Sequence, residues 1–152
     1  VHLLDVDAHD NVVQGNFIGT DRTGVKQIGN QSGGVLIKNA AKNLIGGTVD
    51  GAGNTIRFNN GAGVTVVESV PNQAKLDAIR GNGISDNAGL GIDLGDDGVT
   101  PNDPGDGDPG ANKLQNRPII SSVVASAGSL TITGRLRSAP NKTYQIDLFA
   151  NN

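Results

Sequence analysis

The residues with the clearest chemical potential lie in one acidic segment, GIDLGDDGVTPNDPGDGDPG, at positions 91–110. This segment contains six aspartates and no basic residue. Confining so much like charge to one loop is unfavourable unless solvent or a cation screens it. Calcium suits the composition, because it takes about six to eight oxygen ligands from carboxylates, amides and backbone carbonyls. Glycine and proline would let the backbone curl around such an ion.

The spacing of these aspartates differs from the helix-loop-helix calcium pattern, and no glutamate follows to supply a bidentate ligand. Two interpretations of the segment therefore stay open. It is either a calcium-binding loop, with Asp103, Asp106 and Asp108 as the ligands, or a hydrated acidic linker. In the first case, the ion would fix the linker and the strands that follow it relative to the structure before it.

The same segment raises the question of carbohydrate chemistry, because glycoside hydrolysis needs two carboxylates that flank the sugar bond. The run GDDG (95–98) resembles the aspartate pair of polygalacturonase-type glycosidases. The candidates for an enzyme are therefore Asp96 and Asp97, together with the nearby Asp93. That resemblance also implies a downstream histidine and a basic substrate clamp, whereas both histidines, His2 and His9, lie far upstream. Adjacent aspartates on a strand would also point to opposite faces. The alternative is an acidic turn without catalytic function.

Composition narrows the class of protein. The chain has 152 residues, 23 of them glycine, and only 3% are aromatic, which favours short strands joined by many tight turns. The absence of cysteine excludes disulfides, thiolate zinc sites and cysteine nucleophiles. A net charge of −3 without a basic stripe argues against a nucleic-acid partner. No apolar run approaches the length of a membrane span, so we expect no membrane insertion.

The first two thirds of the chain repeat themselves. NVVQGNFIG (11–19) is echoed by DAIRGNGIS (77–85), and a third copy is split into NLIGG (43–47) and NTIRFNNGAG (54–63). A second element, glycine followed by aliphatic residues, recurs as GGVLI, AGVTV and AGLGI. Val1, Val35, Val64 and Leu90 then begin successive units.

Several further positions correspond between these units. Two sets hold asparagine or aspartate: Asn11, Asn43 and Asp77, and Asn16, Asn54 and Asn82. An isoleucine follows each member of the second set two residues later, at Ile18, Ile56 and Ile84. Each unit contains three short strands whose aliphatic side cannot be buried by one unit alone. Stacking the units coaxially buries it, since like residues then pile on like as parallel strands. The sequence predicts a parallel β-helix of about three to four coils over residues 1–98, with Ile56, Val66 and Ile84 in its interior.

These repeats resemble a known family. The run NVVQGNFIGTDRTG…GGVLIKNAAKNLIGGT…GAGNTIRFNN is similar to the right-handed parallel β-helix repeats of large bacterial secreted or surface proteins, in the pectate-lyase-like superfamily. The resemblance covers roughly residues 1–98 and implies right-handedness, which the spacing does not. It also implies a secreted or cell-surface location. The chain begins at Val1, and we expect it to be part of a larger parent protein, whose remaining parts would be its partners.

The resemblance also implies that lyase activity is an alternative, because members of this superfamily act on polysaccharides. A lyase needs carboxylates that hold calcium and an arginine base on one exposed face. Arg80, Asp86 and Asp93 fall on adjacent coils and are the candidates. Mixed charges on an exposed solenoid face are more often a solvated surface with marginal ion pairs. His2 and His9 could share a metal, or could be surface residues of the first coil.

A different pattern follows the repeats. Residues 99–117 are rich in aspartate, glycine, proline and asparagine and are predicted to be a linker. In residues 118–152, three segments, RPIISSVVAS, SLTITGRLRS and TYQIDLFANN, predict antiparallel strands, because their apolar residues alternate and turn residues separate them. We expect an incomplete β-sandwich. The open strand edges of this module and of the β-helix favour self-association.

The sequence thus favours a non-catalytic structural or adhesive β-helix module of a larger secreted or cell-surface bacterial protein. The alternative is a carbohydrate-active enzyme, either a polysaccharide hydrolase or lyase, or a degenerate remnant of one. A third possibility is polysaccharide binding without catalysis, which the scarcity of aromatic residues to stack on sugar rings makes less favourable. Calcium is the one cofactor that the composition suggests.

Overall fold

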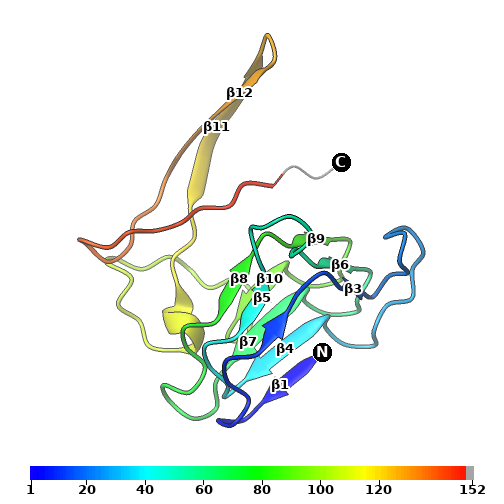
Figure 1. Ribbon diagram of the computed structural model, residues 1–152. Coiled ribbons are helices and arrows are strands. Elements are labelled where there is room, and N and C mark those ends of the chain that lie inside the picture. The colour runs from blue at the N-terminus through cyan, green and yellow to red at the C-terminus, as the bar shows by residue number, and fades with distance from the viewer. Residues whose placement is uncertain (150–152) are drawn as a thin grey trace.

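The computed structural model describes residues 1–149 and is built almost entirely of β-strands (Figure 1). Ten short strands form three parallel sheets, each with one strand from each of three coils, and the first sheet has one strand more. The first sheet has the order β1 (His2–Leu4), β4 (Val35–Lys38), β7 (Val64–Val67) and β10 (Ile92–Leu94). The second contains β2 (Val12–Val13), β5 (Leu44–Gly46) and β8 (Ala78–Arg80). The third contains β3 (Phe17–Ile18), β6 (Thr55–Arg57) and β9 (Gly83–Ser85).

This order defines a parallel β-solenoid of about three turns, with β10 beginning a further one, and confirms the predicted stacking. Ile18 pairs with Ile56, and Ile56 pairs with Ile84, as the repeat alignment predicts. The solenoid forms because no coil can bury its aliphatic residues alone. Among the described residues, no helix is long and apolar enough to cross a membrane.

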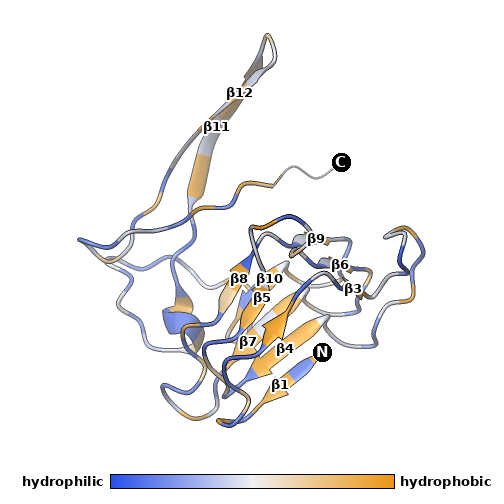
Figure 2. Ribbon diagram, in the orientation of Figure 1, coloured by the Kyte–Doolittle hydropathy of each residue, from blue (hydrophilic) through white to orange (hydrophobic). Residues whose placement is uncertain are grey.

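The core is a set of aliphatic stacks between the three sheets. Figure 2 shows that the strands of these sheets are largely hydrophobic. The largest fully buried apolar side chains of the core, among the described residues, are those of Val35, Ile37, Ile45, Ile56, Val64 and Val66. The prediction of burial is confirmed for Ile56 and Val66. Ile84 is only half-buried, because it lies on β9, where no further strand follows in its sheet. Burial therefore falls toward the last coil.

The predicted start of the fourth unit is wrong by two residues. Ile92, not Leu90, pairs with Val64, and Leu94 pairs with Val66. In GLGIDL, both Leu90 and Ile92 follow a glycine, so either could begin the strand. The two residues are two positions apart, and alternation therefore places both on the same face of the strand. Backbone bonds choose between them, since the amide of Val64 donates to the carbonyl of Gly91 at 2.9 Å.

Close stacking of the turns requires glycine at particular positions. Gly19 has a φ of 83°, and a Cβ at this position would lie 2.1 Å from the carbonyl oxygen of Arg57 in the next coil. Gly46 repeats this arrangement against the carbonyl of Arg80, at 2.2 Å. Side chains other than hydrogen cannot occupy these corners without moving the neighbouring backbone.

The predicted linker closes the end of the solenoid. A short 3-10 segment, η1 (Ala111–Leu114), contacts β7 and β10, and Ala111 is buried in the core cluster. The amide of Asn112 donates to the carbonyl of Ala74 at 2.7 Å. Part of the segment 99–117 thus packs as a cap on the last coil.

After the cap, β11 (Ile119–Ser126) and β12 (Ser129–Arg135) form an antiparallel hairpin that projects away from the solenoid (Figure 1). Its apolar side chains lie open to solvent; Ile120, Val123, Val124 and Leu130 are each 55–58% exposed.

The third predicted strand, TYQIDLF at 143–149, is wrong as a strand, and its predicted continuation, residues 150–152, lies outside the described residues. Side-chain contacts, rather than strand pairing, hold 143–149. Asp147 bonds to Arg80 on the solenoid, and Tyr144 contacts Ser138.

Candidate metal site

The three aspartates predicted as calcium ligands lie together in the structure. Asp103, Asp106 and Asp108 each place one carboxylate oxygen so that the three atoms lie within 4.8 Å of one another. All three residues are half-buried. Glycine and proline between them allow this curl, with Asp106 at a φ of 58° and Gly105 at 84°. The local backbone thus gathers three negative charges at one point.

Asn116 organises the loop around this cluster. Asp103 and Asn116 form a reciprocal pair, in which the Asp103 amide donates to Asn116 Oδ1 at 3.0 Å and Asn116 Nδ2 donates to the Asp103 carbonyl at 2.8 Å. The Asn116 amide donates to Asp106 Oδ1 at 2.7 Å. Asn116 is buried, so these bonds are shielded from water. The ends of the segment from 103 to 116 are thereby tied together.

The cluster is also joined to the base of the hairpin. Asn116 Nδ2 donates to the carbonyl of Arg137, just after β12, at 2.9 Å. Asp106 Oδ2 accepts hydrogen bonds from Gln115 Nε2 at 2.8 Å and from the hydroxyl of Ser138. The aspartates therefore lie where the solenoid cap, the start of β11 and the chain after β12 meet.

Two oxygens of the cluster fit a bound cation. Asp103 Oδ1 and Asp108 Oδ1 are both buried and have no hydrogen-bond partner. Asp103 Oδ2, by contrast, accepts from the amide of Gly107 at 3.0 Å. A buried carboxylate oxygen without a partner is costly, and a hard cation that binds oxygen would remove the cost. Three carboxylates supply only part of a calcium shell, so backbone carbonyls or water would complete it.

The second polar feature consists of ladders of amide side chains that run through the solenoid. In the first, Asn43 Oδ1 accepts from the backbone and side-chain nitrogens of Asn11, both at 3.0 Å. In the second, Asn54 Oδ1 accepts in the same way from Asn16, at 2.9 and 3.0 Å. Each bond joins adjacent coils. The predicted correspondence of these positions is confirmed.

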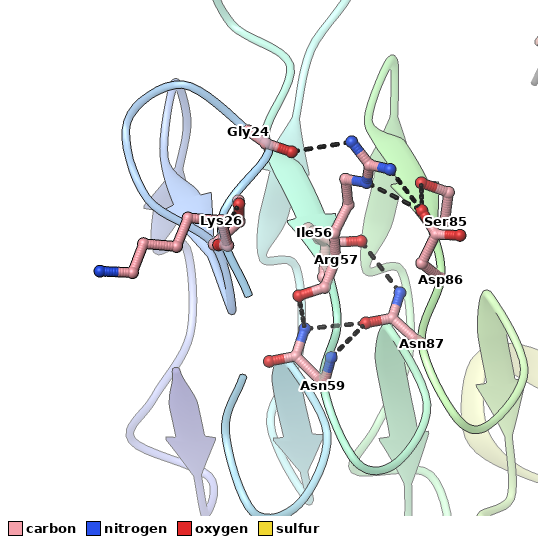
Figure 3. Close-up of polar contacts among 9 residues, drawn as sticks. Gly24, Lys26, Ile56, Arg57, Asn59, Ser85, Asp86 and Asn87 are labelled. Carbon is pink, nitrogen blue, oxygen red and sulfur yellow. Dashed lines mark hydrogen bonds and ion pairs between the residues drawn. The ribbon is translucent and has the colours of Figure 1, made fainter. Parts of the chain in front are cut away.

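Sequence reasoning missed a third ladder, which runs through Asn30, Asn59 and Asn87. Figure 3 shows its last step, where Asn59 donates to Asn87 Oδ1 from its backbone nitrogen at 3.0 Å and from Nδ2 at 2.8 Å. A signal for it exists in the sequence. Each of these asparagines stands five residues before a strand of the first sheet, at Val35, Val64 and Ile92.

An ion pair lies beside this ladder (Figure 3). Arg57 Nη2 lies 2.5 Å from Asp86 Oδ2, and Arg57 Nη1 donates to the carbonyl of Gly24 at 2.8 Å. Hydrogen bonds from Arg57, with a further one from Ser85, lower the pKa of Asp86. The guanidinium also covers the Phe58 ring, 4.7 Å from its centroid. Arg57 thus joins neighbouring coils.

The residues proposed for lyase chemistry have different partners. Arg80 binds Asp147 at 2.6 Å, and hydrogen bonding with Arg80 lowers the pKa of that aspartate. Asp86 binds Arg57, as described. Asp93 is buried, and its Oδ2 accepts from the amide of Gly98 at 3.2 Å. The three residues belong to or follow strands of three different sheets.

The other candidate residues lie at the surface. Asp96 and Asp97 are exposed in the bend after β10, not on a strand. His2 and His9 are also exposed, on the first coil. His9 Nδ1 lies 2.6 Å from the carboxylate of its neighbour Asp10. These positions give no enclosed site.

No protein family, curated protein or solved structure matches this chain.

Proposed function

We propose that this chain is a non-catalytic structural or adhesive module of a larger secreted or cell-surface bacterial protein. In this proposal, calcium bound by Asp103, Asp106 and Asp108 fixes the joint between its solenoid and its hairpin. The bacterial origin, the location and the parent protein rest on the resemblance of the repeats to pectate-lyase-like β-helices. The structural role rests on how the polar side chains are used.

The observation that carries the proposal is the position of the acidic cluster. Asp106 accepts hydrogen bonds from Asn116 and Ser138, on either side of the hairpin, while Asn112 of the same loop binds the last coil. A cation at this point would hold three segments together with one set of ligands. The two buried oxygens without partners, on Asp103 and Asp108, supply the chemical reason for it to bind.

The use of the solenoid's polar groups supports a structural role. Asparagine side chains join successive coils in three ladders, and Arg57 and Arg80 are each held by a carboxylate. These contacts use the asparagines and arginines to join parts of the chain. Stiffness along the solenoid axis is the property that these contacts provide, and it suits a stalk or spacer.

Calorimetric titration with calcium tests the metal site. We expect one ion per chain and a rise in Tm with millimolar calcium over chelator, because a ligand that binds only the folded state stabilises it by about 2.7 kcal/mol at 100 times its Kd. The double variant Asp103→Asn/Asp108→Asn removes the charge of the two oxygens without partners and should abolish the rise. Asp96→Asn/Asp97→Asn removes the same charge from the exposed bend of the same segment and should leave the rise intact.

A wild-type Tm that is identical in calcium and in chelator would show that the cluster does not bind calcium and is only a polar turn. Catalysis is tested separately, by incubating the chain with acidic polysaccharides and measuring reducing ends and unsaturated products. Release of either product, abolished by Asp93→Asn, would overturn the non-catalytic role and favour the hydrolase or lyase alternative.

A further inference from the structure

One position of the first ladder holds an acid in place of an amide. The ladder runs through Asn11, Asn43 and Asp77 and ends on Asn112 of the cap. Asp77 belongs to the coil next to the cap and is 7% exposed. This residue therefore links the last coil of the solenoid to the segment that closes it.

The amide at the preceding position shows what the ladder needs. Asn43 donates to Asp77 Oδ1 twice, from its backbone nitrogen and from Nδ2, each at 2.9 Å. Asp77 repeats the first of these bonds, since its amide donates to Asn112 Oδ1 at 3.0 Å. It cannot repeat the second as a carboxylate, because neither of its side-chain oxygens then carries a hydrogen to donate. Asp77 Oδ2 is buried and has no hydrogen-bond partner.

The surroundings give the ionised acid little compensation. The charged residues on the adjoining segments are Asp10, Lys42, Lys75 and Lys113, whose side chains are exposed. Within residues 1–149, none of them forms an ion pair with Asp77. Burial raises the pKa of Asp77, while the hydrogen bonds from Asn43 lower it, with burial the larger cause.

We propose that Asp77 is a proton-binding site that couples the cap to the solenoid. The acid takes one proton from solvent on Oδ2 and donates it in a hydrogen bond to Asn112 Oδ1. The protonated acid then reproduces both donations that Asn43 makes. When the proton leaves, two acceptor oxygens face each other between the last coil and the cap.

This site makes stability depend on pH in a definite direction. A carboxyl group whose pKa is raised on folding binds its proton more tightly in the folded state. Its contribution is fully present below the pKa of the unfolded chain and is lost as pH rises through the folded pKa. The cap is therefore held more firmly in acid than at neutral pH.

The variant Asp77→Asn tests the proposal, because it supplies the missing donor at every pH and keeps the acceptor for Asn43. At pH 7 we expect its Tm to exceed that of the wild type by about 3 °C or more. The difference should shrink as pH falls and Asp77 of the wild type is protonated. Asp50→Asn, an exposed loop position, removes the same charge and should show neither effect.

A pH-independent difference, or an Asp77→Asn protein less stable than the wild type at pH 7, would overturn the proposal. Carbon NMR of the Asp77 carboxyl in the wild type gives an independent answer that does not depend on any variant folding. A titration above the ordinary aspartate pKa supports the proton site, and a titration at or below that value contradicts it.

Discussion

Replacing Asn54 with alanine interrupts the second ladder at its centre. The side chain is 1% exposed and takes part in four hydrogen bonds. Its Oδ1 accepts from both nitrogens of Asn16, while Nδ2 donates to the Val13 carbonyl at 2.8 Å and to Asn82 Oδ1 at 2.9 Å. The variant removes all four bonds, and of these partners the Asn82 side chain is buried.

The expected loss follows from these contacts. At a net value of about 1 kcal/mol for each hydrogen bond, four bonds amount to about 4 kcal/mol. That loss is a large part of the 5–15 kcal/mol or so that stabilises a typical domain. In a chain of this size it corresponds to a fall in Tm of about 10 °C. Buried groups left without partners would increase the loss.

Urea unfolding followed by circular dichroism measures the free energy directly. Asn60→Ala is the matched control, because Asn60 is an exposed asparagine with one long bond, 3.4 Å, to the carbonyl of Gln31. It should change stability by less than about 0.5 kcal/mol. If Asn54→Ala lost no more than Asn60→Ala, the ladders would be a consequence of stacking and not one of its causes.

Two further predictions concern the core and the ends. Ile56→Asp should prevent folding, because it places a carboxylate in a fully buried stack. Ile84→Asp should fold with a lowered Tm, since Ile84 is half-buried. An Ile56→Asp protein that folds with the Tm of the Ile84→Asp protein would contradict the observed burial gradient. The exposed apolar hairpin should drive self-association at high concentration, measured by light scattering, and Val123→Lys/Val124→Lys should reduce it. A wild-type protein that stays monomeric at millimolar concentration would refute the second prediction.

The stacking of coils could be predicted because it depends on residues that occupy corresponding positions in successive repeats. Asn11 and Asn43 stand in the same local sequence, as do Asn16 and Asn54, so alignment of the repeats also aligns the bonds between them. The shift at Ile92 could not be found in this way. Both registers of that segment place an aliphatic residue after a glycine, and the backbone bonds that choose between them come from the neighbouring coil.

The structure of residues 118–149 was harder to predict from the sequence, because the residues that they contact are distant in the chain. Arg80 and Asp147 are 67 residues apart, and alternation in TYQIDLF predicts a strand without indicating which partner it finds. The acidic cluster could be predicted in part. Its composition pointed to Asp103, Asp106 and Asp108, but their link to Ser138 depends on the return of the chain after the hairpin. Buried oxygens without partners are likewise visible only in three dimensions.

The central claim is that asparagine side chains join the coils into one cooperative structural unit. Native-state hydrogen exchange followed by NMR tests it most directly, at the backbone amides of Asn43, Asn54 and Asn59, which donate to ladder oxygens in the next coil. If the ladders join the coils, all three amides exchange only through global unfolding, with the same free energy as the core amides of Ile45 and Ile56. Exchange of these amides at the rate of the exposed loops, while the core stays protected, would contradict it.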